Sequence, residues 1–113
     1  MSGTLLESTS HPIQGVGYGI SDLKFVEKIG FDDTIAVSGK EAQETARNLA
    51  RTEGIFAGYS SGANVAAAIK LLRGKYRGKT IIVVVCDSGL KYLSTDLWTN
   101  RCNDPESPKN FVV

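Results

Sequence analysis

The strongest hydrophobic pattern in the chain is an uninterrupted run of β-branched aliphatic residues, Ile81 to Val85. A run that does not alternate with polar residues is typical of a strand covered on both faces, as in a parallel sheet flanked by helices. The run leads directly into Asp87-Ser88-Gly89, a combination that favours a turn. Polar groups at the carboxyl end of a buried parallel strand lie where α/β folds bind ligands. We therefore expect Asp87 and Ser88 to face a ligand.

A first helix is predicted over about Gly39 to Thr52. Ser38 and Glu41 have the S-x-x-E spacing of a capping box, which marks a helix N-terminus. Alanine and leucine residues then recur on one face, opposed by charged and polar residues. Gly54 supplies a stop at the C-terminal end.

A second helix is predicted over Ala63 to about Leu72, opened by Ser60-Ser61-Gly62. Its first half is apolar on nearly every side and consists of small residues, which indicates close packing against neighbours. The helix N-terminus and the hydroxyls of Ser60 and Ser61 could form an anion site. The alternative is that one of the two serines is simply an N-cap. The residues alone leave both interpretations open.

Glycine recurs at alternate positions in the stretch Pro12–Ile20. Such a backbone can adopt positive φ or approach a ligand closely. The spacing does not fit G-x-G-x-x-G, and no strong strand precedes it, so it does not indicate a dinucleotide site. A ligand loop and an ordinary glycine loop both remain open.

Weaker patterns predict a short helix over Ser21–Ile29, a short strand over Thr34–Ser38 and a helical turn within Leu90–Trp98. The resulting order of strands and helices is typical of a layered α/β fold. Two strands do not make an independent sheet, because about three or more are needed. We therefore expect part of a larger domain or of an obligate assembly.

Composition narrows the classes of partner. The chain has 113 residues and a net charge of +1, and no block of like charge supports binding to nucleic acid or to an acidic membrane. No apolar run approaches the roughly 18 residues that span a bilayer, and the N-terminus lacks the pattern of a signal peptide. Cys86 and Cys102 are too few for a disulfide scaffold. A cytoplasmic location is the expectation.

Three blocks, in this order, resemble the C-terminal portion of the cysteine synthase and cystathionine β-synthase family. They are His11–Gly17, similar to H-x-I-Q-G-I-G; Glu53–Ala63, similar to E-G-I/L-F/L-x-G-x-S-S-G-A; and Cys86–Thr95, similar to P/C-S/D-x-G-x-R/K-Y-L-S-T. Members of this family are pyridoxal-phosphate enzymes of fold type II. The resemblance implies an α/β fold class, the chain being part of a parallel-sheet, helix-flanked large domain. The resemblance covers residues 11–98, a segment of that domain, while polar composition predicts a flexible lead-in at 1–10 and a tail at 99–113.

The resemblance further implies a pyridoxal 5′-phosphate site. Asp87 takes the position of the polar side chain at the cofactor's pyridine nitrogen, and Ser88 is the next candidate. An aspartate there would hold the ring nitrogen protonated and strengthen the electron sink. The Ser60 and Ser61 turn would border the cofactor ring from another side. The remaining implied contacts are the cofactor-binding Gly15 and Gly17, and the substrate-binding Gly15, Val16, Gly17 and Tyr18.

The chain also departs from the family. The Schiff-base lysine, the phosphate loop and the loop that grips the substrate carboxylate belong to the family's N-terminal half. Five lysines of this chain lie in capping, helical or loop contexts that do not match that lysine's context: Lys40, Lys70, Lys75, Lys79 and Lys91. Such an enzyme needs the lysine to hold the cofactor and move protons. We therefore expect a C-terminal fragment of a β-replacement enzyme that joins serine, O-acetylserine or O-phosphoserine to a sulfur nucleophile, inactive by itself.

Two other functions compete with this expectation. The chain could be a non-catalytic interaction module that pairs with a separate N-terminal half or with a full-length relative, and the resemblance implies a homodimer. It could also be a generic α/β nucleotide-binding domain whose motifs match by coincidence.

Overall fold

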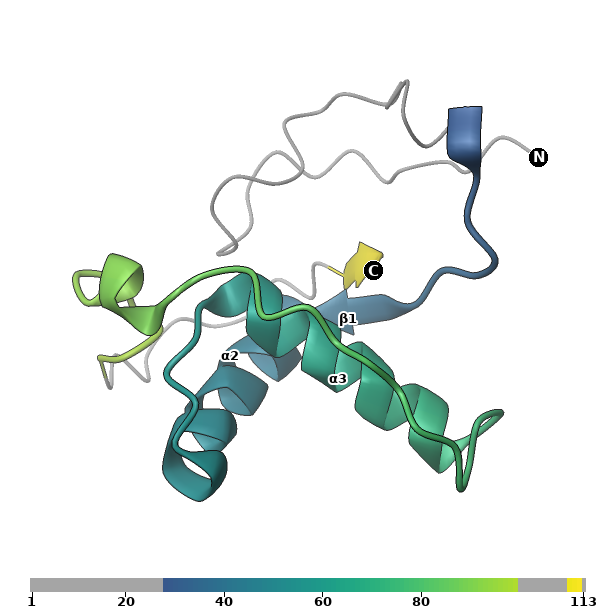
Figure 1. Cartoon of the computed structure of the whole chain (residues 1–113). Helices are drawn as coiled ribbons and strands as arrows, with labels where there is room; N and C mark the ends of the chain where they lie inside the picture. Colours follow the sequence, from purple (N-terminus) through teal and green to yellow (C-terminus); the bar gives the residue numbers. More distant parts are fainter. Residues whose placement is uncertain (1–27, 100–109, 113) are drawn as a thin grey trace.

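The computed structural model describes residues 28–99 and 110–112. The predicted glycine loop at Pro12–Ile20 lies outside these residues, and so does nearly all of the predicted helix Ser21–Ile29. Figure 1 shows two helices crossing each other, with the segment after the second helix turning back along it toward its N-terminal end. The elements in chain order are β1 (Ala36–Ser38), α2 (Gly39–Asn48), a π-helical turn η1 (Leu49–Glu53), α3 (Tyr59–Arg73), a 3-10 turn η2 (Gly89–Tyr92) and β2 (Asn110–Val112).

The predicted first helix is confirmed as α2 followed by η1. Its capping box is complete: the Glu41 amide donates to Ser38 Oγ at 3.2 Å, and the Ser38 amide donates to Glu41 Oε2 at 2.7 Å. The last turn widens into η1 and stops at Gly54, whose φ of 68° is left-handed. Glycine reaches that conformation without a steric penalty, which explains why the helix ends there.

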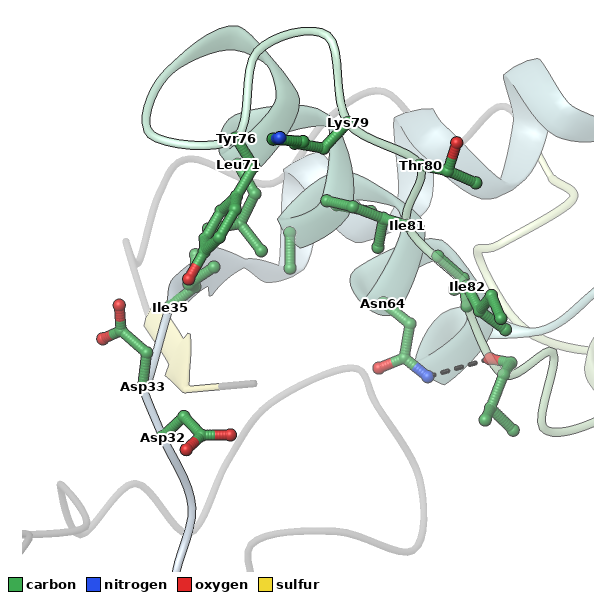
Figure 2. Close-up of a pocket in the computed structure, with 14 residues that line it drawn as sticks. Asp32, Asp33, Ile35, Asn64, Leu71, Tyr76, Lys79, Thr80, Ile81 and Ile82 are labelled. Atoms are coloured by element: carbon green, nitrogen blue, oxygen red, sulfur yellow. Dashed lines mark hydrogen bonds between the residues drawn. The ribbon is translucent and has the colours of Figure 1, made fainter.

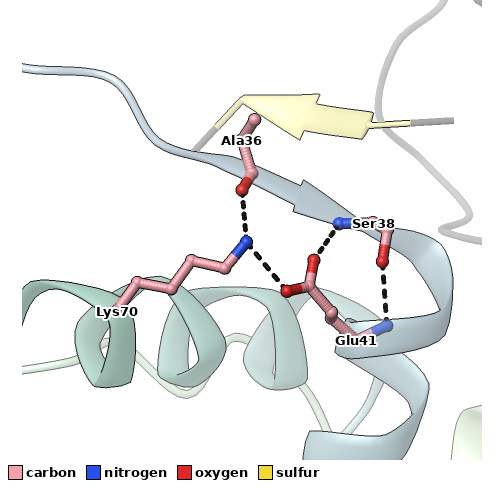
Figure 3. Close-up of polar contacts among 4 residues, drawn as sticks. All are labelled: Ala36, Ser38, Glu41 and Lys70. Atoms are coloured by element: carbon pink, nitrogen blue, oxygen red, sulfur yellow. Dashed lines mark hydrogen bonds and ion pairs between the residues drawn. The ribbon is translucent and has the colours of Figure 1, made fainter. Parts of the chain in front are cut away.

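Helix α2 is tied to α3 by a polar contact and by close packing. Lys70 on α3 approaches Glu41 Oε1 at 2.8 Å and donates to the carbonyl oxygen of Ala36 at 2.7 Å (Figure 3). Where the helices cross, Gly62 allows the two backbones to meet. A β-carbon at Gly62 would lie only 2.1 Å from the carbonyl oxygen of Ala42. The crossing therefore depends on the absence of a side chain at this position.

Helix α3 begins four residues earlier than predicted. Its N-cap is Gly58, and no side chain caps it, so the interpretation of Ser60 or Ser61 as an N-cap is wrong. The reason is packing: Tyr59 is fully buried, and turning it into the core draws the first helical turn forward. Ser61 is also fully buried, and its Oγ accepts a hydrogen bond from the Cys86 amide at 2.9 Å.

The run Ile81–Val85 is extended but is not a strand, and it is not covered on both faces, so this prediction is corrected. Ile81 and Val83 are half-buried, whereas Ile82 is 93% exposed and Val84 is 69% exposed. A strand exists only where a second strand shares its hydrogen bonds, and no described residue pairs with this run. Within the described residues it is held instead by α3, where Asn64 Nδ2 donates to the Val84 carbonyl at 3.0 Å.

The described sheet has two antiparallel strands. The strand predicted over Thr34–Ser38 is present as β1, and it pairs with β2 in the register Ala36 to Val112 and Ser38 to Asn110. Strand β2 lies in the stretch that the sequence pattern assigned to a tail, so part of that stretch forms an element. Among the described helices, none is long and apolar enough to cross a membrane.

Candidate functional site

The turn that carries Asp87 is fastened to the connector that leads into α3. The Gly58 amide donates to the Asp87 carbonyl at 3.3 Å, and the Gly89 amide donates to the Phe56 carbonyl at 3.0 Å. Ala57 and Ser88 form an isolated antiparallel bridge between these two bonds. The turn and the N-terminal end of α3 are therefore joined by backbone hydrogen bonds, which brings Asp87 close to the turn that contains Ser60 and Ser61.

Only one of the two oxygens of the Asp87 carboxylate has a hydrogen-bond partner among the described residues. The hydroxyl of Tyr92 donates to Oδ2 in a short hydrogen bond. Oδ1 is buried and has no hydrogen-bond partner among the described residues, and it is the only buried side-chain oxygen or nitrogen there in that condition. Leaving a buried acceptor unpaired costs about 1–3 kcal/mol, so such an atom marks a position where a donor is missing.

Gly58 creates the space in which this carboxylate lies. A β-carbon on Gly58 would be 2.4 Å from Asp87 Oδ1 and 2.3 Å from Cε2 of Tyr92. Both distances are far below van der Waals contact. The first turn of α3 is thus shaped around the Asp87–Tyr92 pair, which we call the site pair.

Burial raises the pKa of the Tyr92 hydroxyl from its ordinary 10.0 to about 12, and the hydrogen bond to Asp87 adds to the effect. The hydroxyl therefore stays protonated at neutral pH and remains a donor. The ring of Tyr92 meets the ring of Tyr59 edge-on, with centroids 5.8 Å apart and planes at 89°. This contact fixes the direction in which the Tyr92 hydroxyl points.

A second tyrosine–aspartate pair lies beside the first. Tyr59 donates to Asp96 Oδ1, and we call these two residues the anchor pair. Burial, followed by the hydrogen bond to Asp96, raises the pKa of Tyr59 far above its ordinary value. The carbonyl of Asp96 accepts from Gln43 Nε2 at 2.8 Å and from Arg47 Nη2 at 2.7 Å. Unlike the site pair, the anchor pair is surrounded by donors from α2.

The other predicted site residues divide into three groups. Ser88 is exposed, and its Oγ accepts from the Leu90 amide at 3.2 Å, so it caps η2. Ser60 is half-buried in the first turn of α3, while Ser61 holds the Cys86 amide. The remaining predictions lie outside the described residues: Gly15, Val16, Gly17 and Tyr18.

Sequence reasoning missed Tyr92 and Gly58 as members of the site. Both fall inside blocks that carried the family resemblance, and that was the available signal. Neither residue type indicates by itself that it shapes or orients a carboxylate, because the roles depend on contacts between distant parts of the chain.

An open apolar groove runs between α3 and the segment Lys79–Val84. Figure 2 shows Ile81 and Asn64 facing it, with Asp32 and Asp33 at the opposite edge. Its volume is about 640 Å³. None of the residues that line it is a predicted site residue, so the groove and the site pair are separate features. Among the described residues, no group of His, Cys, Asp and Glu is placed to hold a metal ion.

Comparisons with known proteins agree on one family. The sequence model described as "Pyridoxal-phosphate dependent enzyme" matches residues 3–87. The chain is 40% identical over 111 residues to cysteine synthase A of Escherichia coli strain K12, covering 94% of this chain and 33% of the relative. It is 42% identical over 100 residues to a cysteine synthase of Buchnera aphidicola from Acyrthosiphon pisum, covering 88% of this chain and 31% of the relative.

Solved structures give the same result. The crystal structure of cysteine synthase from Entamoeba histolytica superposes with a TM-score of 0.71 and 33% identity, covering 87% of this chain and 28% of that one. A mutant O-ureido-L-serine synthase with O-ureido-L-serine bound gives a TM-score of 0.53 and 39% identity, covering 61% of this chain and 21% of that one. The expected fold class is confirmed by these similarities. The chain spans about a third of the length of the curated relatives that it matches.

Proposed function

Because this chain belongs to the family of pyridoxal-phosphate dependent enzymes, we propose that it forms the ring-nitrogen side of a pyridoxal phosphate site in a cysteine synthase-like enzyme. The proposed reaction replaces the β-substituent of serine, O-acetylserine or O-phosphoserine with a sulfur nucleophile. When bound, pyridoxal phosphate supplies an electron sink for charge that develops at the substrate.

The observation that carries this proposal is the unpaired, buried Oδ1 of Asp87. A protonated ring nitrogen is a charged donor, and a carboxylate oxygen without a partner is its natural acceptor. The atom belongs to the residue that the family resemblance assigns to this contact, on a turn fastened to α3. These observations support the proposal that the described residues form the ring-nitrogen side of the cofactor site.

The proposed role of Asp87 is to accept the hydrogen bond of the ring nitrogen and keep the proton there. Ser61 is proposed to act indirectly, because its hydroxyl holds the Cys86 amide and with it the start of the turn. Ser60 borders the ring from the first turn of α3, and Ser88 is the second candidate for the nitrogen. The substrate side is proposed to be the loop with Gly15, Val16, Gly17 and Tyr18.

The contacts of three described lysines support the expectation that the covalent lysine lies elsewhere. Lys70 is engaged by Glu41 and by the Ala36 carbonyl, and Lys75 lies 3.7 Å from Asp33. Lys91 has its ammonium 6.0 Å from the centroid of the Tyr92 ring, on an exposed turn. We propose that the covalent lysine belongs to polypeptide matching the rest of the relatives' length, and that this chain alone does not turn substrate over.

The test is a titration of the 113-residue chain with pyridoxal phosphate, followed through the fluorescence of Trp98. This is the single tryptophan, and its Nε1 donates to the Gly89 carbonyl at 3.0 Å, close to the site pair. We expect saturable quenching that weakens in D87A. Equal quenching in D87A, or none in the unmodified chain, contradicts the proposal.

A borohydride trap separates the question of the lysine from that of binding. Reduction fixes any imine between cofactor and lysine, and peptide mapping locates it. We expect only scattered, substoichiometric labelling. Stoichiometric labelling of one lysine, Lys91 above all, would show that the chain carries its own covalent site.

A second candidate function is a non-catalytic interaction module. The specific observation in its favour is the apolar run Ile81–Val85, in which Ile82 is 93% exposed and Val84 is 69% exposed. Exposed apolar residues at this density indicate a surface that another polypeptide covers. The partner would be a separate N-terminal half or a second copy. Sedimentation that finds a folded monomer at all concentrations contradicts the second copy.

A further inference from the structure

The site pair contains a residue whose role goes beyond the proposed function. We propose that Tyr92 is a positioning residue that orients the Asp87 carboxylate, so that one oxygen is satisfied within the protein and the other is left for the cofactor's ring nitrogen. This inference rests on the proposed function, since it assigns how the same site is held in place.

The two oxygens of the Asp87 carboxylate differ in their hydrogen-bond partners. Tyr92 donates its hydroxyl to Oδ2, whereas Oδ1 has no partner among the described residues. An ionised carboxylate can accept several hydrogen bonds, so a single donor on one oxygen fixes its plane without exhausting its capacity. Burial also keeps the Tyr92 hydroxyl protonated, because its pKa is raised to about 12.

Tyr92 itself has little freedom to move. Its side chain is almost fully buried, and its ring is held edge-on against Tyr59. Its carbonyl accepts from the Thr95 hydroxyl at 2.6 Å and from the Thr95 amide at 3.0 Å. A side chain and a backbone fixed in this way can transmit a fixed direction to a neighbouring carboxylate.

Gly58 lies against the Asp87 carboxylate and the Tyr92 ring. Because Gly58 has no β-carbon, Asp87 Oδ1 and the edge of the Tyr92 ring can both pack against its backbone. The carboxylate is therefore held between a rigid ring and a bare stretch of helix backbone. A group that is already oriented binds its partner without a free-energy cost of reorientation, and protein contacts can tune a cofactor in this way.

The test compares three variants of the full 113-residue chain. Y92F removes the hydroxyl and keeps the ring, D87S removes the charge, and Y59F removes the hydroxyl of the neighbouring anchor pair as a matched control. Two signals are read by nuclear magnetic resonance: the Asp87 carboxylate carbon without cofactor, and the ring nitrogen of added ¹⁵N-labelled pyridoxal phosphate. Far-UV circular dichroism verifies that each variant is folded.

We expect Y92F to shift the Asp87 carbon signal and to move the ring-nitrogen signal toward its unprotonated position. Cofactor affinity should fall roughly fivefold, the change that corresponds to about one hydrogen bond. D87S should move the nitrogen signal further, and Y59F should leave both signals in place. If Y92F does not fold, Tyr92 is replaced by 3-fluorotyrosine, which keeps the shape of the side chain and makes its hydroxyl a stronger donor. This replacement should shift both signals and so tests the same contact.

The outcomes separate the two proposals. Unchanged signals in Y92F, with a shifted nitrogen in D87S, overturn the role of Tyr92 and leave the proposed function standing. An unchanged nitrogen signal in D87S overturns the contact between Asp87 and the ring, and with it the proposed site. If the chain binds no pyridoxal phosphate, the proposed function fails for it. In that case the carbon signal alone decides whether Tyr92 orients Asp87.

Discussion

Gly58, the N-cap of α3, and Gly62 in the first turn of that helix both lack room for a β-carbon, yet they face different kinds of neighbour. Gly62 meets the backbone oxygen of Ala42 at the crossing of the two helices. Gly58 meets the side chains of Asp87 and Tyr92. A backbone inside a helix cannot move aside, whereas a carboxylate and a ring can rotate. Gly62 therefore supports the packing of the two helices, and Gly58 supports the site pair.

The largest effect is expected from G62A. Its new β-carbon would lie 2.1 Å from the carbonyl oxygen of Ala42, so α2 and α3 must separate. Overpacking of this kind costs roughly 3 kcal/mol, a large share of the stability of a small domain. Urea denaturation followed by circular dichroism measures the loss. A midpoint equal to that of the unmodified chain would mean that the helices do not cross as described.

G58A is expected to cost less stability, about 1–2 kcal/mol, because side chains rather than backbone must give way. Its effect on the site should be greater than its effect on the fold, since Asp87 Oδ1 lies within 2.4 Å of the new carbon. Quenching of Trp98 by pyridoxal phosphate should weaken in G58A while its circular dichroism stays native. Normal quenching in G58A would remove the distinction between the two glycines.

The sequence could predict features that depend on neighbouring residues, but not features that depend on contacts between distant parts of the chain. The capping box of Ser38 and Glu41 and the stop at Gly54 were predictable because each signal is local. The run Ile81–Val85 was predicted to be a covered strand because its residue types favour that structure. Whether it becomes a strand depends on a partner strand, and the described residues contain none for it.

The candidate site was predictable to the same extent. Asp87 was identified because it follows the apolar run and lies in a recognisable block. Tyr92 was in the same block, but its role comes from a tertiary contact, which depends on the rotations of two side chains. The early start of α3 was missed for a related reason: burial of Tyr59 outweighed the capping preference of the two serines.

The anchor pair offers a third test of the difference between contacts that stabilise the fold and contacts that shape the site pair. Y59F removes the donor to Asp96 and should cost about 1 kcal/mol at neutral pH. Because the pKa of Tyr59 is raised in the folded state, its contribution is complete below the ordinary value of 10.0 and is lost as pH rises above it. Y59F should therefore flatten the loss of stability above pH 10. A pH series of urea midpoints measures this, and an equally steep alkaline decline in Y59F would contradict it.

The smallest effect is expected at the opposite end of the pH scale, in the contact that joins α2 to α3 (Figure 3). The hydrogen bond from Lys70, followed by that from the Ser38 amide, lowers the pKa of Glu41 below its ordinary 4.5. The stabilisation is therefore complete above pH 4.5 and is lost as pH falls through the lower, folded-state value.

E41Q should lower stability at neutral pH by about 0.5–1 kcal/mol, because the pair is partly exposed and screened by solvent. E44Q is the matched control on the same helix, since Glu44 forms no ion pair within the described residues. The difference between the two variants should shrink as the pH is lowered below 4.5, where Glu41 becomes protonated in both states. A difference that persists unchanged in acid would mean that the amide disturbs the cap sterically, and that the charge of Glu41 contributes nothing to holding α2 against α3.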